Sequence, residues 1–191
     1  MKKILVVSAL VLLSGVFFFA RSFKAPKAAT LKEGDIVFQT STSQQAPFII
    51  AATSSPWSHC GIIIEKDNGI YVLEAVSTVK LTPYNQWVKR GKGGIAKMKR
   101  YTEESVKIKY SKYLGKPYDT AFKFGNDMWY CSELVYDIYK QQLGIELCAP
   151  RPVSDYNITG AEKVLKKRGI SKNQLVVAPN DLYNSKQLKG L

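Results

Sequence analysis

One predicted β-hairpin constrains the fold of this chain more than any other feature of its sequence. Two runs rich in β-branched residues, 59–65 and 70–76, are separated by the turn 66–69, whose Asn-Gly pair readily adopts positive φ. A four-residue loop places residue 65 opposite residue 70 and residue 61 opposite residue 74. The sequence therefore predicts an antiparallel sheet whose register is set by this hairpin.

Further strands and helices are predicted around the hairpin. Strands are expected at 34–40, 95–101 and near 175–178, where Pro179 and Asn180 end the last strand. Helices are expected at 46–52, 103–114, 131–144 and about 159–168. Thr102 as N-cap and Gly115 as terminator favour the second of these helices. Helices interspersed with a mostly antiparallel sheet indicate an α+β domain.

The first 25 residues have the pattern of an export segment. Lys2 and Lys3 precede an uncharged run from Ile4 to Ala20, after which Arg21 restores charge. This run exceeds the roughly 7–15 apolar residues of a signal-peptide core and approaches the shortest membrane-spanning helix. Residues 1–25 are therefore expected to be a signal peptide or an N-terminal membrane anchor, and we favour the anchor. Residues 26–191 are expected to form one domain, exported to the periplasm or cell envelope.

The chain is strongly basic, with a net charge of +13. Without the four basic residues of the export segment, 24 basic and 15 acidic residues still give +9. Such an excess suits contact with an anionic cell-envelope surface, and export argues against nucleic acid as a partner. Exposed lysines on a helix face, such as Lys163, Lys166 and Lys167, would account for the excess equally well.

Cysteine and histidine are scarce in this chain. Three cysteines, Cys60, Cys131 and Cys148, cannot all pair within one chain, so at least one thiol is expected to be free in an oxidising compartment. No two cysteines have metal-ligand spacing, and His59 is the only histidine, so we expect neither a metal site nor a cofactor. Pairing of Cys60 with Cys148 and the oligomeric state stay open.

Cys131 is predicted to be the first residue of a helix. A helix N-terminus lowers the pKa of a thiol, and the unpaired backbone N–H groups of Cys131 and Ser132 can stabilise the oxyanion of an acyl-transfer intermediate. These are the requirements of a cysteine nucleophile. The alternative is a buried structural cysteine.

The hairpin register makes His59 and Glu74 diagonal neighbours on one sheet face, with Cβ atoms roughly 7–8 Å apart. Glu74 can then hold one imidazole nitrogen while the other faces a thiolate, as in a catalytic triad. The alternatives are an ordinary polar strand residue for His59 and an exposed strand residue for Glu74.

Five short motifs, in this order and spacing, resemble the YiiX/YebB-like group of circularly permuted NlpC-type papain-like cysteine hydrolases over about residues 31–180. They are Gly34-Asp35-Ile36-Val37-Phe38, Ser58-His59-Cys60-Gly61, Tyr71-Val72-Leu73-Glu74-Ala75, Gly115-Lys116-Pro117-Tyr118-Asp119 and Tyr130-Cys131-Ser132-Glu133-Leu134-Val135. The resemblance implies a permuted papain-like α+β fold, with helices packed on a small antiparallel sheet or half-barrel. It implies Cys131 as nucleophile, His59 as base and Glu74 as the orienting residue, with Tyr118 lining the site and Ser132 beside the nucleophile.

The activity implied by the resemblance is hydrolysis of amide bonds through an acyl-enzyme. The wider family suggests peptidoglycan-derived peptides as substrates; the alternatives are a lipid amide or ester, hydrolysed or used for acyl transfer, and a catalytically silent binding module. Cys60 departs from the family, since many relatives have threonine or another small residue there. Strand alternation turns Cys60 away from His59, so we expect it to serve packing.

Overall fold

A computed structural model describes residues 25–190 of the chain. The predicted signal peptide or anchor lies outside the described residues, apart from Ala25. None of the helices within residues 25–190 has the length and hydrophobicity that a membrane span requires.

Six strands form one antiparallel sheet in the order β4-β3-β2-β1-β5-β8. Their bounds are β1 Ile36–Gln39, β2 His59–Lys66, β3 Gly69–Ala75, β4 Val79–Pro83, β5 Ala96–Arg100 and β8 Lys189–Gly190. A separate two-stranded sheet joins β6 Arg151–Pro152 to β7 Leu175–Val176. The strand predicted near 175–178 is therefore present but shorter than expected.

The β2–β3 hairpin has the predicted register. Glu65 lies opposite Ile70 and Ile62 opposite Leu73, and the turn residues Asp67 and Asn68 have φ of 48° and 60°. Gly61 is required where the strands approach, because a Cβ there would lie 2.4 Å from Val72 Cγ1. The close approach brings residue 74 up to the start of β2.

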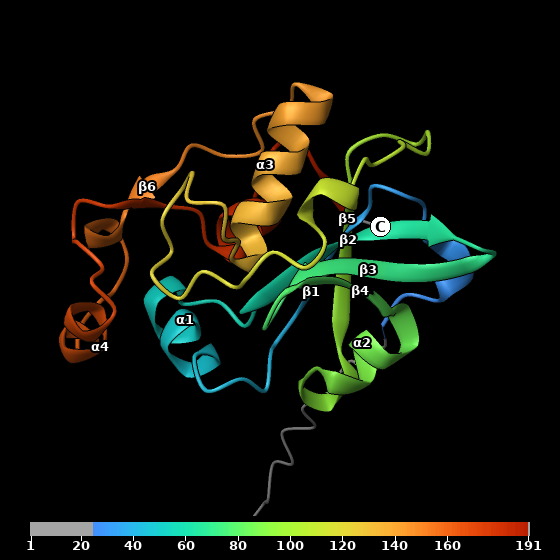
Figure 1. Ribbon diagram of the computed structural model, residues 1–191. Helices are drawn as coiled ribbons and strands as arrows, with labels where there is room; N and C mark the ends of the chain where they lie inside the picture. The colour runs from blue at the N-terminus through green and yellow to red at the C-terminus, as the bar shows by residue number, and fades with distance from the viewer. Residues whose placement is uncertain (1–24, 191) are drawn as a thin grey trace, which may run out of the picture.

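Both faces of the sheet are buried, which explains the consecutive isoleucines of β2. Ile62 and Ile64 face α3 (Cys131–Leu143), while Ile63 faces α2 (Tyr84–Arg90) and packs with Trp87. Figure 1 shows α3 above the sheet and α2 below it. The α3 helix begins and ends as predicted, and Gly144 terminates it with φ of 69°.

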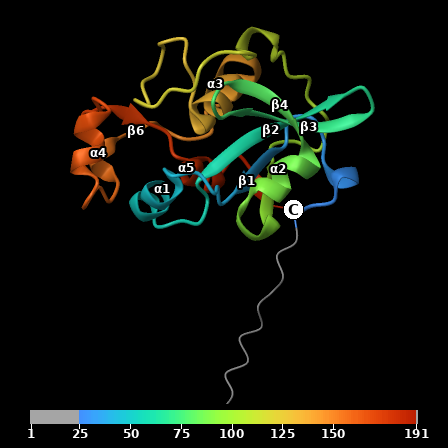
Figure 2. The ribbon, with the colours of Figure 1, turned by 60° about the horizontal axis from the view of Figure 1, so that its bottom comes forward.

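The remaining helices are short. They are α1 Ala46–Thr53, α4 Glu162–Lys167 and α5 Pro179–Tyr183, with 3-10 turns η1 Ala28–Thr30, η2 Lys92–Gly94, η3 Ser111–Tyr113 and η4 Val153–Asp155. Figures 1 and 2 show α1, α4 and β6 at the end of the molecule away from the β2–β3 turn. This end carries much of the wall of the cleft described below.

The predicted helix at 103–114 is wrong. Only η3, at Ser111–Tyr113, is helical in this stretch. The backbone N–H of Ile108 donates to the Glu33 carboxylate at 2.9 Å, and the N–H of Val106 donates to the Glu33 carbonyl at 3.3 Å. These groups bond to the segment before β1, so they cannot form helical hydrogen bonds.

Several elements were not predicted from the sequence. The strand β4 and helix α2 follow directly after β3, and α5 begins at Pro179, which we expected only to end a strand. The apolar spacing of Tyr84, Trp87 and Val88 is a helical signal that would have revealed α2. The fold is nonetheless of the predicted class, an α+β domain with helices packed on a small antiparallel sheet.

Candidate active site

His59 and Glu74 contact each other, as the hairpin register predicts. His59 Nε2 lies 2.6 Å from Glu74 Oε2. His59 is the first residue of β2 and Glu74 lies near the end of β3, so both side chains sit at the same end of the hairpin. The alternative of an exposed strand residue at position 74 is wrong, because Glu74 is 0% exposed.

Three further donors surround the Glu74 carboxylate. Thr82 Oγ1 donates to Oε1 at 2.6 Å, Trp87 Nε1 donates to Oε2 at 3.0 Å, and Arg90 Nη2 forms an ion pair with Oε2. Burial alone would raise the pKa of Glu74, but hydrogen bonds from His59, Arg90 and Thr82 lower it to about 2. Glu74 is therefore ionised at neutral pH.

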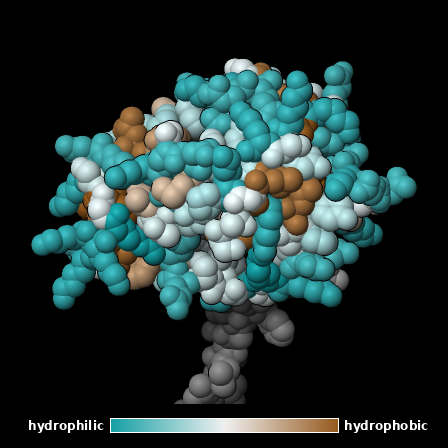
Figure 3. Space-filling view, in the orientation of Figure 1, coloured by the Kyte–Doolittle hydropathy of each residue, from teal (hydrophilic) through white to brown (hydrophobic). Residues whose placement is uncertain are grey.

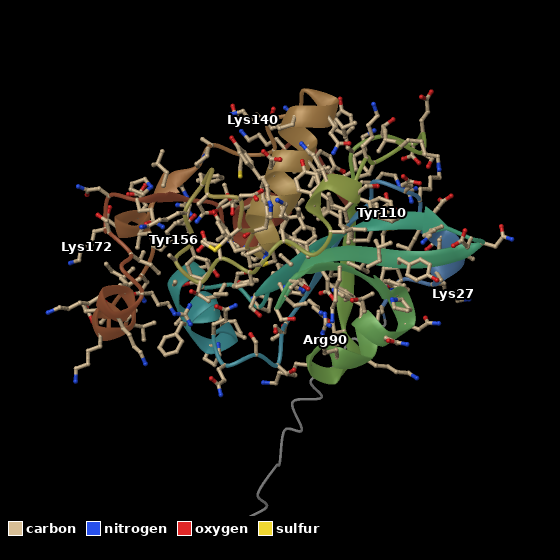
Figure 4. The ribbon with its side chains drawn as sticks, viewed as in Figure 1. Lys27, Arg90, Tyr110, Lys140, Tyr156 and Lys172 are labelled. Carbon is tan, nitrogen blue, oxygen red and sulfur yellow. The ribbon has the colours of Figure 1, made fainter. Side chains whose placement is uncertain are left out.

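The three donors come from β4 and α2, which the sequence analysis did not predict. Figure 4 shows Arg90 on α2, on the side of the sheet opposite α3. A short connection after β3 brings both elements back against the hairpin, so residues close in sequence to Glu74 neutralise its charge. These residues can donate to the Glu74 carboxylate only because β4 and α2 pack against the hairpin.

Cys131 begins α3 at the predicted position, and its side chain is only 4% exposed. Its sulfur forms hydrogen bonds with the side chains of Cys60 and His59. These bonds outweigh burial and hold the pKa of Cys131 well below its usual value. Burial by itself lowers the pKa of His59, but its bonds to Cys131 and Glu74 raise it to about 9. The pair therefore favours a thiolate beside an imidazolium.

The imidazole of His59 bridges the other two groups. Glu74 takes Nε2, which leaves Nδ1 for the sulfur of Cys131. One ring thus joins a thiol at a helix N-terminus to a buried carboxylate. This is the order of groups that activates a cysteine nucleophile.

The packing of Cys60 was predicted from the sequence, but its contact with Cys131 was not. Cys60 packs in the core on the α3 face of the sheet, as expected. In addition, its thiol and its backbone N–H both hydrogen-bond with Cys131. The N-terminus of α3 lies at the start of β2. There Cys131 contacts two successive residues, His59 and Cys60, although their side chains point to opposite faces of the sheet. All three cysteines are free thiols.

Tyr118 and Ser132 both line a cleft that reaches Cys131. The Tyr118 hydroxyl accepts a hydrogen bond from Gln45 Nε2 at 2.7 Å. The Ser132 hydroxyl donates to the Val177 carbonyl at 2.7 Å, so this hydroxyl is already used within the protein. Any contact of Ser132 with substrate would therefore come from its backbone N–H.

Asp35 and Asp119, which belong to two of the five sequence motifs, have structural roles. The Asp119 carboxylate accepts hydrogen bonds from the backbone of Ala121 at 2.8 Å and Lys123 at 2.6 Å, which shapes the loop before Cys131. Asp35 forms a buried ion pair with Arg100, with both bonds at 2.7 Å. These motif residues hold the scaffold around the site and do not reach Cys131.

The cleft encloses about 890 Å³ counted out to its open mouth. Its walls are mainly aliphatic and aromatic side chains from α1, the loop before α3, α4 and the segments between α3 and α5. Among the lining residues are Phe48, Ile49, Ala52, Phe122, Val153, Tyr156, Val164, Leu165, Ile170 and Val176. Figure 3 shows apolar side chains among hydrophilic ones at this end, and Figure 4 shows Tyr156 there.

Apart from Tyr118 and residues 130–132, the cleft wall lies outside the five sequence motifs, because its residues come from short segments scattered between 45 and 179. Gln45 and Arg168 are polar members of its wall that the sequence analysis missed, and Arg168 Nη1 donates to Gln45 Oε1 at 3.2 Å. Within residues 25–190, no group of three or more His, Cys, Asp or Glu side chains is arranged to hold a metal ion.

Comparison with known proteins agrees with this architecture. Residues 30–191 match the family described as permuted papain-like amidase enzyme, YaeF/YiiX, C92 family. The protein of Escherichia coli strain K12 called uncharacterized protein YiiX is 34% identical over 167 residues, which span 81% of this chain and 83% of that protein.

A solved structure is also similar. The crystal structure of a protein described as metalloprotein yiiX from Escherichia coli O157:H7 superposes with a TM-score of 0.77 at 32% identity. The match covers 84% of this chain and 96% of that one. The chain therefore belongs to the C92 family of permuted papain-like amidases, and it is a cysteine hydrolase with the permuted papain-like fold.

Proposed function

We propose that Cys131, His59 and Glu74 are the catalytic residues with which this enzyme hydrolyses amide bonds. The observation that carries the proposal is the position of His59, whose Nε2 lies 2.6 Å from the Glu74 carboxylate while its side chain also hydrogen-bonds with Cys131. A catalytically silent binding module would not require a buried carboxylate with four donors. The family to which the chain belongs consists of amidases.

Acylation begins with the Cys131 thiolate, which attacks the carbonyl carbon of the amide. The electron pair of the C=O bond moves to oxygen, and this oxyanion forms beside the backbone N–H groups at the start of α3, those of Cys131 and Ser132. The His59 imidazolium donates its proton to the amide nitrogen, the C–N bond breaks and the amine leaves.

Deacylation uses the same groups in reverse order. Neutral His59 removes a proton from water, the hydroxide attacks the acyl carbon, and the C–S bond breaks to release the acid and the thiolate. Throughout, Glu74 holds the imidazole ring in position and stabilises its protonated form. Tyr118, held by Gln45 on the cleft wall, is placed to contact the bound substrate.

Two substrate classes follow from the sequence analysis. Peptidoglycan-derived peptides are the class suggested by the wider family and by the predicted export. A lipid amide or ester is the second, and the cleft wall favours it. A polar peptide would lose hydrogen bonds to water against these side chains, whereas each buried CH₂ of an acyl chain contributes about 0.8 kcal/mol.

Two features support a proposed site of action. The pattern of residues 1–25 predicts export, and we propose that the enzyme acts in the periplasm or cell envelope. Exposed lysines of α4, Lys163, Lys166 and Lys167, are suited to an anionic envelope surface near the cleft. Fractionation of cells that produce the full-length chain tests this proposal, and recovery of the protein with cytoplasmic markers would contradict it.

The catalytic assignment is tested with the purified full-length protein in detergent. Iodoacetamide should alkylate Cys131 faster than Cys60 or Cys148 at pH 6, and His59→Ala should slow that reaction. Equal labelling of the three cysteines would overturn the assignment.

The substrate is tested with two panels, peptidoglycan fragments and N-acyl amides of increasing chain length. Products are identified by mass spectrometry. Cleavage should be absent with Cys131→Ala, and cleavage of peptidoglycan fragments alone would exclude the acyl-amide class.

A further inference from the structure

Cys60 stands beside the proposed nucleophile but makes no bond to substrate in the hydrolysis described above, where it only helps to keep Cys131 ionised. It follows His59 in β2 and is 0% exposed. Its side chain packs in the same core cluster as Cys131, and its thiol and backbone N–H both hydrogen-bond with the Cys131 sulfur. Two thiols from distant parts of the chain are thus in contact at the reacting atom.

The two sulfurs differ in accessibility and in charge. Cys131 lines the cleft, whereas Cys60 is not among the lining residues. A small oxidant entering through the cleft therefore meets Cys131 first. Burial raises the pKa of the Cys60 thiol well above its usual value, so this thiol stays protonated and donates to the thiolate.

We propose that Cys131 and Cys60 form a reversible disulfide when a peroxide enters the cleft, which makes this pair an oxidative modification site. The proposal rests on the thiolate of Cys131, which the proposed function also uses. The disulfide bond is about 2.05 Å long, and both side chains belong to one buried core cluster in which they interact, so side-chain rotation is the movement that would join the two sulfurs.

The chemistry has two steps. In the first, the Cys131 thiolate attacks one oxygen of the peroxide, the O–O bond breaks, and Cys131 becomes a sulfenic acid while an alcohol or water leaves. In the second, the Cys60 sulfur attacks the sulfenic sulfur, its thiol proton leaves with the hydroxyl as water, and the S–S bond forms. The two thiols together supply the two electrons that reduce the peroxide.

The disulfide would stop hydrolysis and protect the nucleophile. It removes the thiolate that attacks the substrate, and it prevents further oxidation of Cys131 to the irreversible sulfinic and sulfonic acids. A thiol reductant would restore both sulfurs. Without Cys60, the sulfenic acid has no adjacent thiol and proceeds along the irreversible path.

Cys148 provides a matched control. It is half-buried and free, and burial raises its pKa to about 12, so it lacks the thiolate character of Cys131. The experiment treats the full-length protein with a several-fold molar excess of hydrogen peroxide, because each step from sulfenic to sulfinic to sulfonic acid consumes a further peroxide. Intact mass and peptide mapping then identify the products.

The wild type and Cys148→Ala should lose the mass of two hydrogen atoms and yield a peptide that joins residues 60 and 131. Reduction with dithiothreitol should recover the full alkylation of Cys131. Cys60→Ala should instead gain oxygen atoms on Cys131. In this variant dithiothreitol should restore at least tenfold less alkylation of Cys131 than in the wild type. Cys60→Ser keeps the side-chain volume and should behave in the same way.

Two results would overturn the proposal. One is a wild type in which Cys131 gains oxygen without forming the bond to Cys60, and the other is a bond between Cys131 and Cys148. Because the readout is mass and thiol content, it is independent of hydrolysis. A protein that forms the disulfide but cleaves no amide contradicts the proposed function alone, and an active amidase without the disulfide contradicts this inference alone.

Discussion

The two walls of the site are built in different ways. The hairpin wall carries His59 and Glu74 on adjacent strands of the main sheet, and four polar donors surround the carboxylate. The cleft wall comes from short elements and loops, α1, the segment before α3, and α4, and presents mostly apolar side chains. Polar contacts are directional and require a set register, whereas apolar surfaces tolerate many arrangements. The hairpin wall therefore determines the reaction, and the cleft wall determines which substrate reaches it.

Cys131 lies where the two walls meet, so its removal should have the largest effect. Cys131→Ala should lower kcat/KM by more than about 10⁴-fold, because no other thiol lies on the cleft. Steady-state kinetics measures this loss, and circular dichroism checks that the fold is kept. Cys148→Ala is the control and should retain wild-type activity. Substantial activity in Cys131→Ala would show that Cys131 is not the nucleophile. The hairpin wall and the cleft wall would then not meet at the reacting atom.

The hairpin wall is tested next by removal of its charge. Glu74→Gln should lower kcat by about 10²- to 10⁴-fold, because an amide cannot stabilise the imidazolium and leaves Arg90 without its ionic partner. Thiol alkylation against pH should show a higher pKa for Cys131 in this variant. Glu65→Gln makes the same change on the exposed part of the hairpin and should have little effect. An unchanged alkylation profile in Glu74→Gln would separate Glu74 from the reaction.

The cleft wall is tested by filling it. Ala52 lines the cleft, whereas the neighbouring Ala51 is exposed and does not. Ala52→Trp should lower kcat/KM for long-chain acyl amides by roughly tens-fold and leave short-chain substrates almost unchanged. Ala51→Trp adds the same side chain to the same helix and should affect neither class. Equal losses for short and long chains in Ala52→Trp would show that this wall does not select the substrate.

The pH dependence has the smallest expected effect and again reports on the hairpin wall. The raised pKa of His59, about 9, keeps the imidazolium below that pH, and the lowered pKa of Cys131 keeps the thiolate through neutral pH. Activity should therefore be constant around neutrality and fall as pH rises through about 9, by about tenfold for each further pH unit. A profile of kcat/KM measures it. A decline that begins near pH 6.5, the usual value for histidine, would show that Glu74 and Cys131 do not hold the proton on His59.

The hairpin wall was also the part that could be predicted. The Asn-Gly turn set the pairing of β2 with β3, and alternation along the strands then placed His59 and Glu74 on one face. The helix that starts at Cys131 followed from local periodicity. The predicted helix at 103–114 failed, although its local signals were good, because Glu33 takes the N–H groups of Val106 and Ile108. That competition comes from a residue more than 70 positions away and leaves no local trace.

By itself, the sequence determined the strand register and the start of α3, because turns, side-chain alternation and helical periodicity act over a few neighbouring residues. The three residues proposed for catalysis followed from this local pattern together with the resemblance of five motifs to a known family. Only the tertiary structure decided what surrounds them. Thr82, Trp87 and Arg90 reach Glu74 once α2 packs on the sheet, Cys60 meets Cys131 once α3 lies on β2, and the apolar cleft forms between segments scattered along the chain. Packing of distant elements is selected by the burial of whole surfaces, and no short stretch of residues encodes it.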